Sequence, residues 1–271
     1  MKILLSIVIV MITFSSAHLF AGEKNLMQSS ALNVASLPDV PFRAGEKLNY
    51  DIFYHWGIIW KRAGEGVLCV NFSDYKGQPA YRMNLYGKTL NFADKIMQVR
   101  DTLDAYTTLD LSPLYYSKTA NEGKWWGKDE LKYHYKGEHT HGKTTIHRKN
   151  REPRDTTVKV LGPGFDMLTV FYFLRNVDFS KMIYNESIQI PIFTGRKVVK
   201  MNVKYRGKGK VSLRNKKQYE SIQLYLSFIN DNNLKESDDP ISVWLSDDGR
   251  RVPLKVEGKL PIGSLQAEIR E

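Results

Sequence analysis

Apolar and polar residues alternate along most of the chain after residue 45. In the first such run, Leu48, Tyr50 and Ile52 are separated by Asn49 and Asp51. A period of two puts one face of a strand on a core and the other in water, which is typical of antiparallel sheets. We therefore expect an all-β protein with one large, strongly curved antiparallel sheet, either a half-barrel or a barrel-like meander. The pattern returns over residues 81–85, 131–135, 201–205, 222–228, 252–256 and 265–269.

Glycine and acidic residues separate these runs and predict tight connections. Such residues adopt the backbone conformations that hairpins require. No run is followed by a long helical pattern, so a parallel α/β sheet is disfavoured. Turns are expected at Gly77, Gly137, Gly142, Gly207 to Gly209 and Asp247-Asp248-Gly249.

One segment departs from the period of two. Residues 164–175 are apolar on nearly every side, with Pro163 before them and Asp166 placed to cap a helix. A helix that is apolar all round is typically buried, so we expect one buried helix near residues 165–175, closing the open side of the sheet. A buried strand is the alternative, because Val, Phe and Tyr favour strands. A second, short helix is expected over residues 91–97.

The first residues have the features of a secretory signal. Lys2 precedes an apolar run over residues 3–14, and small residues follow. The run is shorter than the roughly 20 residues that a membrane-spanning helix needs. We expect residues 1–21 to be a cleaved signal peptide, residues 22–41 a flexible leader and residues 42–271 a single β domain. The protein is therefore expected to be exported.

Composition and charge narrow the chemistry. The 271 residues are 42% hydrophobic and 25% charged, an ordinary globular balance, with a formal net charge of +11. The lone cysteine, Cys69, excludes an internal disulfide framework and a thiolate zinc site, since both need several cysteines. Export disfavours nucleotide-driven and dinucleotide-dependent enzymes, and we expect no cofactor.

Two local motifs suggest chemistry but fit a hairpin better. Residues 137–144 match the phosphate-loop pattern G-x-x-x-x-G-K-[ST], yet a β-favouring basic run follows where that loop needs a helix. His139 and His141 could place two imidazoles on one face of a strand, with Glu138 as a third ligand for zinc or copper. No cysteine or carboxylate cluster accompanies them. We expect no metal site, and no motif compels an enzyme.

The most distinctive charge pattern lies between residues 196 and 217, where ten basic residues occur without an acidic one. On an extended hairpin, the basic residues at even positions form one positive stripe, a candidate docking site for anionic lipid, lipopolysaccharide or an acidic glycan. The alternative is a solvated strand face that prevents edge pairing. Nucleic acid is not expected as the partner of an exported protein. The stripe comprises Lys200, Lys204, Arg206, Lys208 and Lys210.

Tryptophans supply a second set of candidate binding residues. Trp56 and Trp60 flank a Gly-Ile-Ile sequence, and Trp125 and Trp126 are adjacent. Adjacent residues of a strand face opposite sides, so one of Trp125 and Trp126 is expected outside the main core. An exposed tryptophan near a loop can stack on a sugar or lie at a lipid interface. The alternative is burial under a loop.

Several short motifs follow one another from residue 42 to the end of the chain. They are FRAGEKLNY from Phe42, Ser112-Pro113-Leu114, the segment from Asp166 to Arg175, VWLSDD from Val243, and Arg251-Val252-Pro253. In their order and spacing they resemble the exported bacterial family of domains of unknown function 3108 (DUF3108). The resemblance implies a location in the periplasm and an architecture similar to the curved half-barrel of periplasmic lipoprotein carriers. It implies no catalytic residues.

Together these features predict a non-catalytic periplasmic protein that binds or carries an amphiphilic or anionic envelope component, such as a lipid, lipopolysaccharide or lipoprotein. A large curved sheet leaves a cavity, and a lipid needs an apolar pocket with positive charge for its head group. The first alternative is a polysaccharide-binding or polysaccharide-acting envelope protein that uses the tryptophan pairs. The second is a structural envelope protein with no small ligand. The first function is compatible with peripheral membrane contact.

Overall fold

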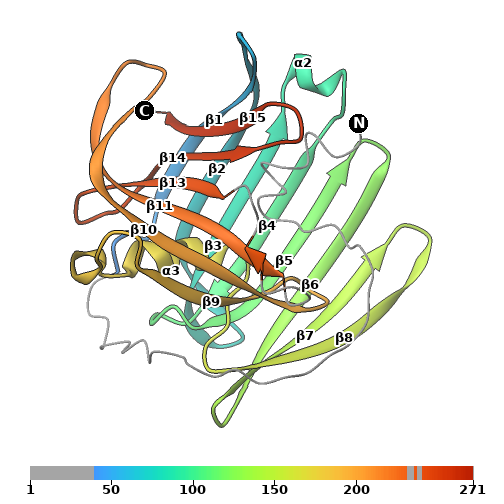
Figure 1. Ribbon diagram of the computed structural model, residues 1–271. Coiled ribbons are helices and arrows are strands. Elements are labelled where there is room, and N and C mark those ends of the chain that lie inside the picture. The colour runs from blue at the N-terminus through green and yellow to red at the C-terminus, as the bar shows by residue number, and fades with distance from the viewer. Residues whose placement is uncertain (1–39, 231–234, 237–239, 271) are drawn as a thin grey trace.

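The computed structural model describes residues 40–230, 235–236 and 240–270. The predicted signal peptide, and the predicted leader up to residue 39, lie outside the described residues. Strands dominate the described chain, and every pair of neighbouring strands in the sheet is antiparallel (Figure 1). The all-β class that the alternation predicted is confirmed.

The first eight strands form a meander in which each strand is hydrogen-bonded to the next. They are β1 (Glu46–Trp56), β2 (Ile59–Tyr75), β3 (Gln78–Thr89), β4 (Arg100–Thr107), β5 (Pro113–Glu122), β6 (Trp125–Lys136), β7 (His139–Arg148) and β8 (Arg151–Leu161). The later strands are β9 (Ser187–Phe193), β10 (Val198–Ser212), β11 (Gln218–Asn230), β12 (Lys235–Glu236), β13 (Ile241–Ser246), β14 (Pro253–Lys259) and β15 (Ser264–Arg270).

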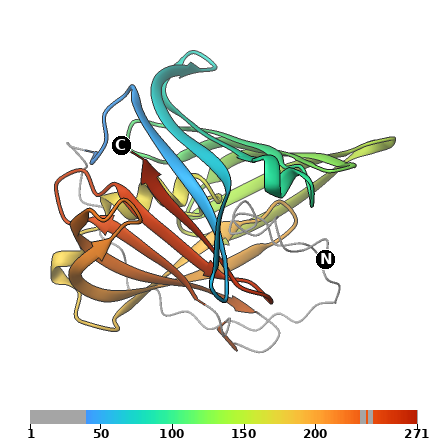
Figure 2. The same cartoon turned by 90° about the horizontal axis from the view of Figure 1, so that it is seen from above.

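These strands form one sheet that curls into a nearly closed barrel (Figure 2). Its order is β8-β7-β6-β5-β4-β3-β2-β1-β15-β14-β13-β11-β10-β9, with β12 attached to β11. The pairing of β1 with β15 brings the beginning and the end of the described chain together. The two outer strands of this order nearly meet. Phe165, which follows β8, donates its N–H to Pro191 O of β9 at 3.0 Å and accepts the N–H of Phe193 at 2.7 Å.

The apolar segment after Pro163 contains a buried helix, α3 (Thr169–Asn176), as expected, and the alternative of a buried strand is wrong. Asp166 Oδ1 accepts the backbone N–H groups of Leu168 and Thr169, each at 2.9 Å, which fixes the start of the helix. The short helix α2 (Asn91–Asp94) covers part of the second predicted segment, and a 3₁₀ turn, η1 (Phe179–Lys181), follows α3.

The barrel has two distinct ends. The turns β2–β3, β4–β5 and β6–β7 lie at the end that α3 fills, which we call the α3 end (Figure 1). The turns β1–β2, β3–β4, β5–β6 and β14–β15 lie at the opposite end, which we call the rim end. This division follows from antiparallel pairing, because alternate turns of a meander lie at opposite edges of a sheet.

Two predicted turns are wrong. Gly142 lies inside β7 on the barrel's inner face, where an added Cβ would approach Cδ1 of Phe193 to 2.7 Å. Because Gly142 has no side chain, it makes room for the Phe193 ring, and it does not form a turn. Gly207 and Gly209 lie within β10, where the pairing with β11 shifts register between Tyr205 and Lys208. The glycines there permit a β-bulge, and the strand continues through it.

Candidate functional site

The inner wall of β1–β4 is built from cross-strand rows of residues. Leu48, Leu68, Leu85 and Leu103 are successive partners across the four strands. The next inner row, towards the rim end, is Tyr50, Gly66, Gly87 and Asp101. Two neighbouring glycines leave the wall without side chains there, so this row contains a hollow between a tyrosine and a carboxylate.

A cavity of about 110 Å³ occupies this hollow. Leu168, just before α3, and Phe171 of α3 bound it on one side, and residues of β1–β4, β14 and β15 form the remaining wall. Apart from Asp101 and the hydroxyl of Tyr50, the side chains that line it are apolar. That hydroxyl is already engaged, since it donates to Pro253 O at 2.8 Å. The cavity is therefore an apolar space with one acidic group at its edge.

Asp101 is held in an unusual environment. Its side chain is only 1% exposed, and Oδ1 accepts the backbone N–H of Asn121 at 2.9 Å. Oδ2 has no hydrogen-bond partner in the described part of the chain, and Nζ of Lys118 lies 3.9 Å away. Burial raises the pKa of Asp101 to about 6. A buried carboxyl oxygen without a donor is costly, so this atom is ready to accept a hydrogen bond from a ligand.

The inner face of β5–β7 carries charge next to the apolar cavity. Lys118 and Asp129 are cross-strand partners, and Arg148 Nη1 lies 2.5 Å from Asp129 Oδ1. Burial lowers the pKa of the Lys118 ammonium. The guanidinium of Arg148 also lies over the ring of Trp125, 5.4 Å from its centroid. The barrel interior is thus apolar on one side and charged on the other.

The predicted tryptophans lie at the rim end. Trp56 ends β1, and Trp125 and Trp126 begin β6 with opposite orientations; all three are exposed, so burial under a loop is wrong for them. Trp60 is partly buried, because its ring stacks on His55 at 3.9 Å and Arg214 lies 4.5 Å from its centroid.

The predicted basic residues of β10 do not form one continuous row. Lys204 is paired with Tyr225, whereas Lys208, beyond the bulge, is paired with the buried Ile222. Since cross-strand partners share a face, the bulge places Lys204 and Lys208 on opposite faces. Lys200 is exposed, and the guanidinium of Arg206 lies over the rings of Tyr184 and Tyr225. The other two basic residues lie near carboxylates: Lys208 pairs with Asp247 at 2.9 Å, and Lys210 Nζ lies 3.5 Å from Glu220 Oε1.

The histidines and the phosphate-loop pattern fall on the β6–β7 hairpin. His134 and His141 are cross-strand partners, and the rings of His139 and His141 are 6.3 Å apart. The described residues contain no group of three or more His, Cys, Asp or Glu side chains able to hold a metal ion. The segment that would follow a phosphate loop as a helix is the strand β7.

The sequence did not predict the cavity residues Gly66, Gly87 and Asp101. A signal was present, because Gly64 and Gly66 lie in an otherwise alternating run, and glycine inside a strand marks a close approach of backbone or ligand. The pairing of Gly66 with Gly87 depends on strand register. That register could not be predicted from the two runs separately.

Comparison with known proteins agrees with this architecture. The family model described as "Protein of unknown function (DUF3108)" matches residues 49–270. The crystal structure of a β-barrel-like protein of the domain of unknown function DUF1849 from Brucella abortus is similar, with a TM-score of 0.54 at 12% sequence identity. The similarity covers 83% of this chain and 95% of that one, and at this identity it concerns the fold. No curated protein matches the chain.

Proposed function

This chain belongs to the family of proteins of unknown function DUF3108, and we propose that it binds and carries an amphiphilic component of the bacterial cell envelope inside its barrel. The apolar part of the ligand occupies the cavity between α3 and the inner glycines. Its polar part lies against Asp101 and Lys118. The protein performs this role in the periplasm and catalyses no reaction.

The observation that carries the proposal is the apolar cavity with an unsatisfied acidic oxygen at its edge. The cavity of about 110 Å³ has room for the end of an acyl chain, and a longer chain extends from it towards the rim end. A ligand hydroxyl or amine that donates to Asp101 Oδ2 removes the cost of that buried atom, on the order of 1–3 kcal/mol. Lys118 offers the same head group a positive charge.

Filling the cavity tests the proposal. An added Cβ at Gly66 would meet its nearest neighbour, Tyr86 O, at 3.7 Å, so Gly66→Leu places a side chain in the hollow without a backbone clash. Dansyl-labelled undecanoic acid serves as the probe, because its fluorescence rises on entering an apolar site. We expect saturable binding to the wild type and a loss of affinity of at least about tenfold in Gly66→Leu.

The matched control is Gly209→Leu. Gly209 is an exposed strand glycine around which an added Cβ meets nothing within 4 Å. Circular dichroism confirms that both variants fold, and the control should bind the probe as the wild type does. Equal binding by the two variants contradicts the proposal, as does a wild type that leaves the fluorescence unchanged.

Exposure of three tryptophans favours a second candidate, binding of an acidic polysaccharide at the rim end. Trp56, Trp125 and Trp126 each present ring surface to solvent, and such rings stack on sugars. Titration with alginate, followed by tryptophan fluorescence, separates the two candidates. A shift that Trp126→Ala removes and Gly66→Leu retains supports the glycan, whereas no shift leaves amphiphile binding as the better account.

A further inference from the structure

Large apolar side chains are exposed in four neighbouring turns at the rim end. Ile58, at the tip of the β1–β2 turn, is 98% exposed. A soluble surface rarely gathers so many large apolar groups without covering them when it functions. We call this set the apolar rim: Trp56, Ile58, Ile59, Phe92, Ile96, Trp125, Trp126 and Ile262.

Hydrogen bonds tie these turns into one surface. Tyr54 donates to Ile262 O at 3.2 Å, which joins the β14–β15 turn to the β1–β2 hairpin. The backbone N–H of Leu90, just before α2, donates to Ala63 O of β2 at 2.9 Å. The N–H of Gly123, in the β5–β6 turn, donates to Gln98 O at 2.7 Å. Figure 1 shows the tip of the β1–β2 hairpin and α2 at the same end of the sheet.

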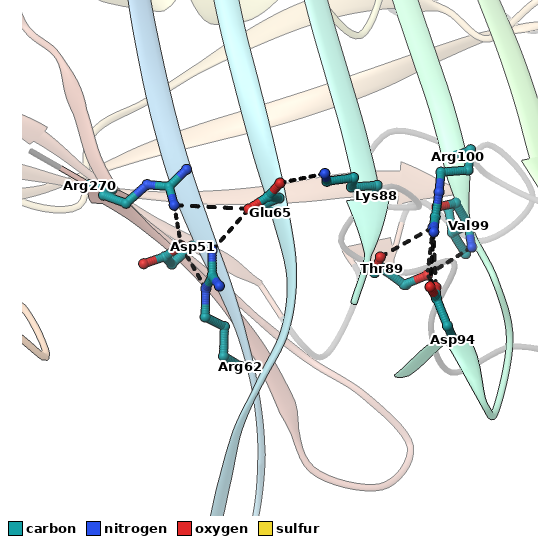
Figure 3. Close-up of polar contacts among 9 residues, drawn as sticks. All are labelled: Asp51, Arg62, Glu65, Lys88, Thr89, Asp94, Val99, Arg100 and Arg270. Carbon is teal, nitrogen blue, oxygen red and sulfur yellow. Dashed lines mark hydrogen bonds and ion pairs between the residues drawn. The ribbon is translucent and has the colours of Figure 1, made fainter. Parts of the chain in front are cut away.

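Charges around the apolar rim are predominantly positive. Lys61, Lys95 and Lys124 are exposed in or beside its turns. The nearby acidic groups on the outer face are already paired, as Figure 3 shows. Their pairs are Asp51 with Arg62 at 2.7 Å, Glu65 with Lys88 at 2.7 Å, and Asp94 with Arg100 at 2.9 Å.

The α3 end also exposes large apolar side chains, among them Phe72, Leu109 and Ile183, but its charge differs from that of the rim end. Its turns and the segment after α3 contain seven carboxylates and five basic residues, Lys76, Lys136, Lys181, Arg250 and Arg251, so this end has no excess of positive charge to attract an anionic surface. The charge of the molecule is therefore directional, with the apolar rim at the more positive end. These carboxylates are Asp74, Asp110, Glu138, Asp178, Glu186, Asp247 and Asp248.

We propose that the apolar rim docks on an anionic lipid bilayer, with Trp and Ile side chains inserted at the interface and the lysines among the head groups. Tryptophan prefers the membrane interface because its ring is amphipathic, and each basic residue near an anionic surface adds attraction. The described residues contain no helix long and apolar enough to span a membrane. The proposed docking is a peripheral attachment through the exposed turns of the apolar rim. It also places the barrel interior next to the lipid.

Co-flotation with lipid vesicles tests the docking. The vesicles contain phosphatidylcholine with phosphatidylglycerol as the minor lipid, and the protein is used without the predicted signal peptide (residues 1–21) and without any added ligand. We expect the wild type to float with them at low salt, with weaker binding as salt rises because exposed charges are screened. Ile58→Ser should weaken binding by about tenfold, since it removes one inserted aliphatic side chain.

The matched control is Ile183→Ser, a residue that is 74% exposed at the α3 end and should bind like the wild type. Lys61→Gln, Lys95→Gln and Lys124→Gln combined should weaken binding further and flatten its salt dependence. The proposal is overturned if the wild type does not float, or if Ile58→Ser and Ile183→Ser behave alike. It is also overturned if sedimentation without vesicles shows a dimer that becomes a monomer in Ile58→Ser, since the apolar rim is then an interface between two copies of this chain.

This docking is independent of the proposed cargo. Gly66→Leu alters only the cavity, so it should float with the vesicles as the wild type does. A protein that docks but binds no dansyl-labelled fatty acid retains this inference and loses the proposed function. The reverse result retains the function and loses the docking.

Discussion

Asp101 lies where ionisation is unfavourable. Its carboxyl group is buried between the apolar cavity and the charged wall, with Lys118 and Glu122 as the ionisable neighbours. Burial is the largest influence and raises its pKa to about 6, above the ordinary value of 3.8. The folded protein therefore holds the Asp101 proton more tightly than the unfolded chain does. It follows that this residue favours folding at low pH and opposes it at neutral pH.

The first prediction concerns Asp101→Asn. As pH rises from about 4 to above 6, the wild type should lose up to about 3 kcal/mol of unfolding free energy through this residue. The asparagine variant does not ionise, so its stability relative to the wild type should rise over the same interval. Urea unfolding of both proteins at about pH 4 and about pH 7 measures the difference. A pH-independent difference would show that Asp101 ionises in the folded state as freely as in the unfolded chain.

A buried ion pair joins β1 to α3, beside the apolar packing between them. Arg175, at 1% exposure, donates from Nη1 and Nη2 to the two carboxylate oxygens of Glu46 at 2.6 and 2.9 Å. It also donates to Arg250 O at 3.0 Å, in the β13–β14 turn. Arg251, the first residue of the Arg251-Val252-Pro253 motif, donates in turn from Nη1 to Arg175 O at 3.3 Å, so three of the motifs that resembled DUF3108 meet at the α3 end. Glu46, the last residue of FRAGE, is the first residue of β1 and binds Arg175 of α3. The motif therefore has a structural role.

The second prediction follows from removing one partner of this pair. Glu46→Gln leaves the Arg175 guanidinium buried without a full countercharge, which should cost about 3–5 kcal/mol of unfolding free energy. Glu65→Gln is the control, because Glu65 makes several ion pairs on the outer face, and loss of these should cost at most about 1 kcal/mol. Denaturant unfolding compares them. Equal losses of unfolding free energy in the two variants would mean that the buried Glu46–Arg175 pair stabilises the protein no more than the exposed ion pairs do.

At the scale of the whole molecule, barrel closure relies on packing more than on a continuous hydrogen-bond ladder. Only Phe165 connects the segment after β8 to β9 through paired backbone hydrogen bonds in the described chain. Phe193 fills the space beside this connection, edge-on to Tyr133 with ring centroids 5.5 Å apart. Gly142 of β7 and Gly164 both lie against the Phe193 ring. Small residues on one side and one ring on the other thus bring the two outer strands together.

The third prediction tests this closure. Gly142→Leu forces a side chain towards the ring of Phe193 and should destabilise the protein by roughly 1–3 kcal/mol, as overpacking of a dense core does. The exposed Gly209→Leu should cost much less. Thermal unfolding gives the ranking, and near-ultraviolet circular dichroism reports the environment of the nearby aromatic rings. If the two variants unfold together, the ring of Phe193 has room to move and does not hold the barrel closed.

The sequence by itself determined the all-β class and indicated several of the strands, and it favoured the buried helix. The alternation of apolar and polar residues is a local property of a strand, and it does not depend on which strands lie beside it. The run from Leu48 to Ile52 is therefore recognisable without any structure, and so is the apolar segment after Pro163, whose Asp166 supplies its own cap. The motifs also identified the family correctly.

Tertiary structure alone decided which residues became neighbours. Gly66 forms the hollow only because register sets it beside Gly87, and a shift of one residue would turn both to the other face. The bulge after Tyr205 interrupts the basic stripe because one additional residue in β10 reverses the facing of those beyond it. The apolar rim likewise requires turns far apart in sequence to reach the same end of the barrel. Strand pairing joins residues that are far apart in the sequence, so the pattern of apolar and polar residues along the chain does not specify it.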